Sequence, residues 1–170
     1  MKLGLLARYF KIINRSHYVN FNLGYLFFMW IAQRIFRING DVPFLIHFTN
    51  KISGFKNIKL EDNSLQLSFL SSGGCYFAAF DGTTIEIGSG SIWACNVCIQ
   101  TANHVPGNLS SYEKKSVKIG RNCWLGNGVV ITAGVELGDN VVVGANSVVT
   151  KSFPANTVIA GVPAKIIRSF

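Results

Sequence analysis

The pattern of hydrophobic and polar positions is most regular in the second half of the chain, where one aliphatic residue recurs at every sixth position. These marker residues are Ile119, Leu125, Ile131, Leu137, Val143 and Val149. Each is followed by a small or turn-compatible residue: Gly120, Gly126, Thr132, Gly138, Gly144 and Thr150. A helix repeats every 3.6 residues and a two-faced strand every two, so neither explains a strict six. This period is typical of a parallel β-helix, in which three short strands make up each coil.

In such a coil each marker side chain points into the interior. The small residue after it then lets the backbone turn a corner, where a positive φ is often needed. The same spacing continues upstream at Ile87, Trp93 and Ile99. Residues 41–86 are less regular and predict one or two imperfect coils, with a strand where Leu65, Leu67 and Phe69 alternate. We therefore expect an all-β solenoid over residues 51–170, preceded by an arm or cap at residues 1–50.

One excursion from this solenoid is expected. Ile119 lies 20 residues after Ile99, two more than a full coil of 18, and residues 105–116 have the composition of a loop. Loops on a rigid scaffold often carry functional residues, and His104 precedes this one directly. The other two histidines, His17 and His47, lie in the arm and in an apolar segment, where a structural role is preferred.

The arm has an unusual charge distribution. The chain carries 16 basic and 8 acidic residues, a formal net charge of +8. Residues 1–40 contain no acid and six bases, interleaved with aromatic residues: Lys2, Arg8, Lys11, Arg15, Arg34 and Arg37. The apolar run over residues 23–32 is too short to span a bilayer, and Arg8 and Lys11 interrupt any signal-peptide core. Two interpretations stay open: a partly helical cap on the first coil, or an amphipathic segment on an anionic membrane surface. No nucleic-acid recognition motif accompanies the charge.

The four cysteines are expected to be structural thiols in a reducing cytosol. Cys95 and Cys98 form a CxxC pair, but a zinc site needs about four ligands and no second pair or nearby histidine pair supplies the rest. We therefore expect no metal. A metal-binding β-helix such as the γ-type carbonic anhydrases would require three converging histidines, and only His104 lies on the regular coils.

Three stretches of the carboxyl-terminal half resemble the hexapeptide-repeat acetyltransferases. They are IGRNCWLG at 119–126, VVTK at 148–151 and AGVPAKIIR at 160–168. The chain is most similar to the maltose/galactoside acetyltransferases and to the sugar O-acetyltransferases of capsule and O-antigen synthesis, over residues 85–168. This resemblance implies a left-handed parallel β-helix, a homotrimer and acetyl-CoA as donor substrate.

The resemblance also implies roles for individual residues. His104 matches the family's general base, and an imidazole suits proton removal from a sugar hydroxyl near neutral pH. Trp124 matches an aromatic wall of the active site, although it could equally fill a coil corner. The implied acetyl-CoA contacts are Asn127, Ala145, Thr150, Lys151, Lys165 and Arg168. The three cations among them would bind CoA phosphates, the alternative for Lys165 and Arg168 being a solvated basic tail.

Two departures from the family pattern affect these expectations. Many relatives place an Asp beside the catalytic histidine, whereas Val105 follows His104 here. Asn103 or a backbone carbonyl could orient the imidazole instead. Gly74 and Gly82 fall near the positions of acceptor-binding polar residues, so we expect an acceptor other than a free maltose or galactoside.

The sequence thus predicts an O-acetyltransferase acting on a sugar of a bacterial surface polysaccharide. We expect it in the cytoplasm, or peripherally at the inner face of the cytoplasmic membrane if its acceptor is a lipid-linked glycan. An N-acetyltransferase acting on an amino sugar or a xenobiotic is the alternative enzyme. A catalytically silent trimeric scaffold is the alternative outside enzymes.

Overall fold

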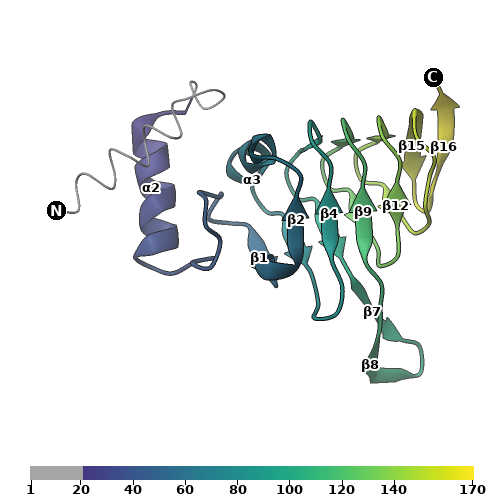
Figure 1. Ribbon diagram of the computed structural model, residues 1–170, viewed down its shortest axis with the longest axis horizontal. Helices are drawn as coiled ribbons and strands as arrows, with labels where there is room; N and C mark the ends of the chain where they lie inside the picture. Colours follow the sequence, from purple (N-terminus) through teal and green to yellow (C-terminus); the bar gives the residue numbers. More distant parts are fainter. Residues whose placement is uncertain (1–20) are drawn as a thin grey trace.

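The computed structural model describes residues 21–170 (Figure 1). The basic residues Lys2, Arg8, Lys11 and Arg15, together with His17, lie outside the described residues. A helix, α2 (Leu23–Arg34), lies at one end of the described chain, and short strands stacked along the long axis make up most of the remainder.

The strands form three sheets that run the length of the stack. Sheet A contains β1 (Lys51–Ser53), β3 (Tyr76–Ala78), β6 (Cys98–Gln100), β11 (Val130–Ile131) and β14 (Val148–Val149). Sheet B contains β2 (Ile58–Leu60), β4 (Ile85–Ile87), β9 (Val117–Ile119) and β12 (Glu136–Leu137). Sheet C contains β5 (Ile92–Trp93), β10 (Trp124–Leu125), β13 (Val142–Val143), β15 (Thr157–Gly161) and β16 (Ala164–Ser169). Neighbouring strands are parallel except β15 and β16, which pair antiparallel and close sheet C.

The chain visits the three sheets in rotation. From β4 onwards it passes through sheets B, C and A in turn, and each strand pairs with one a full circuit later. Leu125 lies beside Val143, for example, and Ile131 beside Val149. Phe153 follows the same order, because it forms an isolated β-bridge with Leu137 of sheet B. A repeat of six residues therefore places one strand on each sheet.

The interior between the sheets is filled by the marker residues. All nine are at most 3% exposed, as the six-residue pattern predicts: Ile87, Trp93, Ile99, Ile119, Leu125, Ile131, Leu137, Val143 and Val149. Four residues after a marker, Cys123, Val129, Val135 and Val141 are equally buried. The apolar residues of successive coils thus form one continuous core.

The residue with positive φ at each corner is not the small residue directly after a marker, where we expected it. Gly120 and Gly126, directly after a marker, do not have positive φ; a Cβ on Gly120 would lie 2.5 Å from the carbonyl carbon of Gly138 in the next coil. Their small size is needed because successive coils approach closely. The left-handed backbone occurs two residues later and is occupied by Asn or Gly, as at Asn122 (φ 54°) and Gly128 (φ 69°), the residue types that tolerate it best.

The predicted strand at Leu65, Leu67 and Phe69 is wrong. A 3₁₀ turn (Asn63–Leu65) leads into a short helix, α3 (Gln66–Ser71), and another 3₁₀ turn (Phe55–Asn57) precedes β2. Asp62 caps the first of these turns by accepting a hydrogen bond from the Ser64 amide at 2.7 Å. Leu65 and Phe69 are fully buried whereas Leu67 is not. This spacing of four is helical.

Helix α2 begins at Asn22, whose side chain accepts a hydrogen bond from the Gly24 amide at 2.7 Å. Its buried residues Leu26 and Met29 pack with Leu45 and with Leu70 of α3. The buried Gln33 donates to the carbonyls of Val42 (3.0 Å) and Phe44 (2.8 Å) and accepts from the Ile46 amide. The connecting segment over residues 42–46 is therefore fixed against the helix.

The outer faces of the three sheets differ in polarity. Sheet B carries a row of alternating charge, in register across its strands: Lys59, Glu86, Lys118 and Glu136. The corresponding row of sheet C is Ile92, Trp124, Val142 and Val158, and it ends at Arg168. That of sheet A begins at Lys51 and continues through Tyr76, Cys98, Val130 and Val148. Sheet B thus presents an ionic face and the other two sheets present apolar rows.

Candidate active site

The predicted excursion is a β-hairpin that leaves the stack between sheets A and B (Figure 1). Its strands β7 (Ala102–Val105) and β8 (Asn108–Lys114) pair antiparallel, with Gly107 in left-handed conformation at the turn. The hairpin starts earlier than residue 105, because the Pro106–Gly107 turn lets residues on both sides pair. His104 therefore lies on the first strand of the hairpin, opposite Tyr112.

The imidazole of His104 is oriented by a backbone carbonyl. Its Nδ1 atom lies 2.7 Å from the carbonyl oxygen of Leu109. A carbonyl oxygen can only accept, so in the neutral ring Nδ1 carries the hydrogen and the lone pair is on Nε2. Asn103, the other candidate for this role, accepts a hydrogen bond from Gln100 at 3.2 Å. The side chain of His104 is exposed, and Nε2 is the ring atom suited to accept a proton from a substrate.

One face of the imidazole rests on an aromatic stack. The centroid of the Tyr112 ring lies 4.5 Å from that of His104 at an interplanar angle of 40°, and the Tyr112 ring packs on Phe80 at 5.7 Å. Phe80 belongs to the coil beneath the hairpin, where its amide donates to the hydroxyl of Thr101 at 2.9 Å. These rings connect the histidine to the rigid stack.

Thr101 fixes the base of the hairpin. It is fully buried, and its hydroxyl also contacts that of Thr83 at 2.6 Å. Its amide donates to the carbonyl of Ala78, and its carbonyl accepts from the amide of Lys115 at 2.9 Å. Both strands of the hairpin are thereby held at the point where they leave the coils.

Trp124 lies on another side of the molecule. It is on β10 of sheet C, its side chain is directed outwards, and it is 40% exposed. The hairpin carries His104 at the edge between sheets A and B, the edge opposite sheet C in a three-sided stack. Within one chain, the structure does not bring Trp124 and His104 together.

The six residues expected to contact acetyl-CoA also fall into two groups. Asn127 and Ala145 occupy successive corner turns between sheets C and A, where the Asn146 amide donates to the Asn127 carbonyl at 2.8 Å. Lys165 and Arg168 are exposed on β16 of sheet C. Arg168 pairs with Val158 in the Trp124 row, roughly 14 Å from Trp124 at about 4.8 Å per strand.

Thr150 and Lys151 belong with His104 instead. They follow β14 at the edge between sheets A and B, the edge from which the hairpin emerges. Both are exposed, and the Lys151 ammonium lies 5.7 Å from the centroid of the Phe153 ring. One chain therefore carries two separate sets of candidate residues: His104, Thr150 and Lys151 on one edge, and the sheet C set on the far side.

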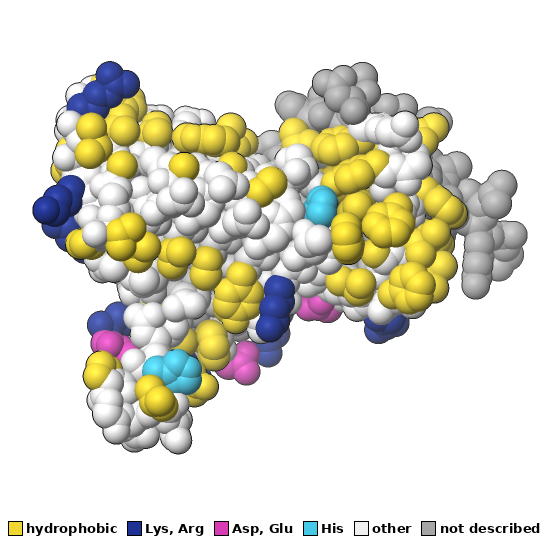
Figure 2. Space-filling model, turned by 180° about the vertical axis from the view of Figure 1, so that it is seen from behind, with side chains coloured by type: hydrophobic (Ala, Val, Ile, Leu, Met, Phe, Trp, Pro, Cys, Tyr) yellow, Lys and Arg dark blue, Asp and Glu magenta, His cyan; other side chains and the backbone are white. Residues whose placement is uncertain are grey.

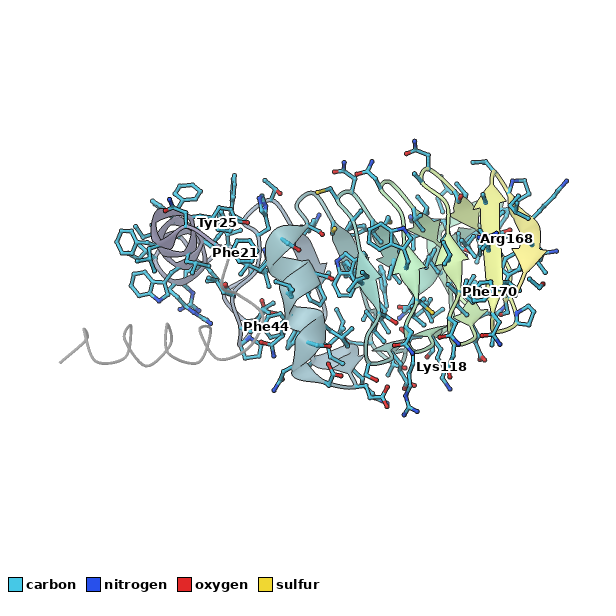
Figure 3. The ribbon with its side chains drawn as sticks, turned by 90° about the horizontal axis from the view of Figure 1, so that it is seen from above. Phe21, Tyr25, Phe44, Lys118, Arg168 and Phe170 are labelled. Atoms are coloured by element: carbon cyan, nitrogen blue, oxygen red, sulfur yellow. The ribbon has the colours of Figure 1, made fainter. Side chains whose placement is uncertain are left out.

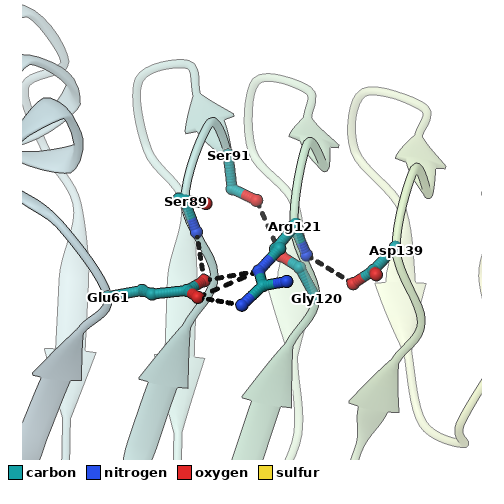
Figure 4. Close-up of polar contacts among 6 residues, drawn as sticks. All are labelled: Glu61, Ser89, Ser91, Gly120, Arg121 and Asp139. Atoms are coloured by element: carbon teal, nitrogen blue, oxygen red, sulfur yellow. Dashed lines mark hydrogen bonds and ion pairs between the residues drawn. The ribbon is translucent and has the colours of Figure 1, made fainter.

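A groove of about 590 Å³ lies over sheet B, and Arg121 and Glu61 in its lining form an ion pair (Figure 4). Arg121 binds both carboxylate oxygens of Glu61, and the Ser89 amide donates to the same carboxylate at 2.8 Å. The hydrogen bond from Arg121 is the main reason that the pKa of Glu61 falls to about 2. Asp139 accepts from the Arg121 amide at 2.7 Å. Glu61 stays ionised near neutral pH and is not suited to act as a general acid.

The cysteines provide no obvious nucleophile or metal site. Burial raises the pKa of the Cys75 thiol to about 11, and it also raises those of Cys98 and Cys123. Cys95 is exposed. Among residues 21–170, no group of three or more His, Cys, Asp or Glu side chains is arranged to hold a metal ion.

Comparison with known proteins shows which proteins this chain resembles. Residues 116–151 match the model of the bacterial transferase hexapeptide (six repeats), which covers the most regular coils. Over these coils the chain is similar to the hexapeptide-repeat acetyltransferases.

Individual proteins show the same similarity. A putative lipopolysaccharide biosynthesis O-acetyl transferase, WbbJ, of Escherichia coli K12 is 41% identical over 100 residues, covering 51% of each chain. A hexapeptide-repeat acetyltransferase of Vibrio cholerae, solved with acetyl-CoA, superimposes with a TM-score of 0.59 and 28% identity, over 71% of this chain and 64% of that one. A maltose O-acetyltransferase of Clostridium difficile gives a TM-score of 0.53 and 28% identity, over 98% and 85%. The chain spans about half the length of the curated relatives it matches.

Three features of the site were not found from the sequence: the Leu109 carbonyl, the Tyr112 ring and the buried Thr101. A signal for the hairpin was present, since a Pro–Gly turn directly follows residues 104 and 105. A hairpin centred on that turn pairs His104 with Leu109. The pairing of His104 with Tyr112 depends on the bulge between His104 and Val105, which the turn dipeptide does not specify.

Proposed function

We propose that this chain is an acetyl-CoA-dependent O-acetyltransferase that acylates a sugar hydroxyl of a bacterial surface polysaccharide, with His104 as general base. The observation that carries the proposal is the contact of His104 Nδ1 with the Leu109 carbonyl on a hairpin of a hexapeptide-repeat stack. This contact directs the basic Nε2 atom away from the hairpin backbone, where an acceptor hydroxyl can reach it.

The reaction needs one proton acceptor and no covalent enzyme intermediate. Nε2 of His104 takes the proton of the sugar hydroxyl as its oxygen attacks the thioester carbonyl carbon. The tetrahedral intermediate collapses, the carbon–sulfur bond breaks, and the imidazolium returns the proton to the departing thiolate. The high pKa values of Cys75, Cys98 and Cys123 are consistent with this direct transfer, because a protonated thiol is a poor nucleophile.

We propose that residues from both sets described above bind the donor, acetyl-CoA. Asn127 would lie beside the acetyl end of acetyl-CoA, and Ala145 and Thr150 would offer backbone groups to the pantetheine arm. Lys151, Lys165 and Arg168 would bind its phosphates. The Vibrio cholerae relative was solved with acetyl-CoA, which supports the choice of donor.

We further propose that residues 51–170 form a left-handed β-helix that assembles as a homotrimer with shared active sites. His104 and Trp124 lie on different sides of one chain, so they can line one site only if they come from neighbouring copies. The apolar rows of sheets A and C, set against the ionic row of sheet B, support packing through the two apolar faces.

The acceptor we propose is a capsule or O-antigen sugar, modified on the cytoplasmic side of the inner membrane before export. The similarity to WbbJ, a putative lipopolysaccharide biosynthesis O-acetyl transferase, supports this class of acceptor. The test is release of CoA thiol on mixing acetyl-CoA with a panel of surface-polysaccharide repeat units, with amino sugars as the competing class. His104→Gln should abolish most of the release, and His47→Gln is the matched control. Transfer to amines alone, or no transfer, would contradict the proposal.

A further inference from the structure

Helix α2 and the residues after it present an exposed apolar surface. It comprises Leu23, Phe27, Phe28, Ile35, Phe36 and Ile38, each between 40% and 71% exposed. Figure 2 shows hydrophobic side chains gathered over this part of the molecule. Monomeric soluble proteins rarely expose a contiguous apolar patch of more than a few hundred Å², and larger ones mark sites of association. We propose that this α2 surface docks on an anionic lipid bilayer.

The helix has more apolar surface than its own packing requires. Gln33 and Arg34 are the only amide and charged side chains among its twelve residues, LGYLFFMWIAQR. One side, with Leu26 and Met29, packs on Leu45 and Leu70. Helices that are hydrophobic on all sides are normally buried. Here the remaining sides face outwards, so a second apolar environment is needed to cover them.

The charges around this surface match an anionic partner. Arg37 is exposed just beyond the helix, and the guanidinium of Arg34 donates to the carbonyls of Gly40 and Val42, which leaves its positive charge in place. The sequence has no acidic residue before Asp41. Basic residues near a membrane surface are attracted to anionic lipids by about 1 kcal/mol each, and the half-buried Tyr25 and Trp30 are residue types favoured at the interface.

The helix would lie on the membrane rather than cross it. No helix among residues 21–170 is long and apolar enough to span a bilayer. Twelve helical residues extend about 18 Å, well short of the roughly 30 Å hydrocarbon core. An interfacial helix instead buries its apolar face at the boundary between headgroups and acyl chains.

A second copy of the chain is a less suitable partner. The apolar rows of sheets A and C run along the stack, and they offer long, regular faces for self-association. The α2 surface lies at one end, whereas Arg168 and Phe170 mark the opposite end (Figure 3). Arg34 and Arg37 outnumber the exposed Asp41 beside this surface. A second copy would bring the same excess of positive charge against it, whereas an anionic bilayer would attract it.

The test is flotation of the full chain with vesicles of phosphatidylcholine and phosphatidylglycerol, and with vesicles of phosphatidylcholine alone. We expect binding to the anionic vesicles that weakens as salt rises. Combined Phe27→Ser, Phe28→Ser and Phe36→Ser should weaken it at least about tenfold, since each substitution removes a large apolar side chain from the interface. Phe170→Ser is the matched control, because Phe170 is 67% exposed and Phe36 is 71% exposed.

Arg37→Asn tests the contribution of charge to vesicle binding separately from that of the apolar side chains. Asn tolerates the positive φ of this position (61°), so the substitution removes a charge with little strain. It should weaken binding to anionic vesicles roughly fivefold and leave binding to neutral vesicles unchanged. Circular dichroism of each variant shows whether it folds.

Several outcomes would overturn the proposal. They are no flotation of the native chain, or flotation unchanged by the three serines. If the triple-serine variant has a lower oligomeric mass than the native chain, a second copy covers the surface. Flotation that occurs only after deletion of residues 1–20 would show that this segment covers it. Acetyl transfer to a soluble sugar, measured on the same variants, should be unaffected, so this proposal and the proposed function can fail separately.

Discussion

The Nδ1 atom of His104 lies 2.7 Å from the main-chain oxygen of Leu109, on the opposite strand of the same hairpin. The side chain of the next residue in the sequence, Val105, has no polar group that could orient the ring. A neutral carbonyl fixes the ring and its tautomer without adding a charge next to the base. The orientation of the imidazole therefore depends on the hairpin fold, through this carbonyl and the Tyr112 ring.

The Tyr112 ring is expected to act as a positioning residue for His104. An aromatic contact of this kind contributes about 0.5–1.5 kcal/mol, so Tyr112→Ala should lower kcat roughly two- to tenfold with little change in KM for acetyl-CoA. Tyr112→Phe keeps the ring and should stay near native activity. An unchanged kcat in the Ala variant, or equal losses in both, would show that stacking is unimportant.

Mixed assemblies test whether active sites are shared between copies. His104→Ala and Trp124→Ala should each be inactive or nearly so when alone. Suppose that one copy supplies His104 and its neighbour supplies Trp124. When the two variants are refolded together and assort at random, about a quarter of the sites then contain both native residues. Acetyl transfer should then reappear. Activity that stays at the level of the separate variants would indicate that sites do not combine residues in this way.

Much of the stack was predictable from the sequence, but the reason for its glycines was not. Ile119, Leu125 and Ile131 identify the interior face because burial repeats at every sixth residue. The close approach of Gly120 to Gly138 depends on coil spacing, which no local pattern specifies. Likewise, the helical spacing of Leu65 and Phe69 was hidden by the polar residues around them.

Gly120→Ala should therefore destabilise the fold through a collision between coils. The new Cβ would lie 2.5 Å from backbone atoms of Gly138, and neither coil can move freely. Overpacking of this kind costs about 1–3 kcal/mol, measurable as a fall in the free energy of unfolding in urea. Lys118→Ala, on the exposed face of the strand that precedes Gly120, should change it by less than about 0.5 kcal/mol. Equal effects of the two substitutions would contradict the close approach.

The ion pair of Glu61 and Arg121 should make stability depend on pH in the acidic range. The Glu61 pKa is lowered from 4.5 to about 2 in the folded chain, chiefly by the hydrogen bond from Arg121. Its contribution is therefore fully present above about pH 5 and is lost as pH falls towards 2. The stability difference between the native chain and Glu61→Gln should be constant near neutrality and shrink over that interval. A difference that persists at pH 2 would contradict the ionic origin.

The hairpin shows why the site was only partly predictable. His104 was identified from its place beside an irregular segment and from the family resemblance. Its partners Leu109 and Tyr112 depend on strand register, and a shift of one residue would send each side chain to the other face. Trp124 lies on β10, and only the rotation of strands among the three sheets separates it from His104 in space.

The most direct test of the central claim is the rate of acetyl transfer by His104→Ala, with and without added imidazole, at saturating acetyl-CoA and a sugar acceptor. A general base typically contributes a factor of about 10² to 10⁴. We predict a fall of that size, an unchanged dissociation constant for acetyl-CoA, and partial recovery of the rate with imidazole. A rate within about twofold of the native chain would show that His104 is not the base.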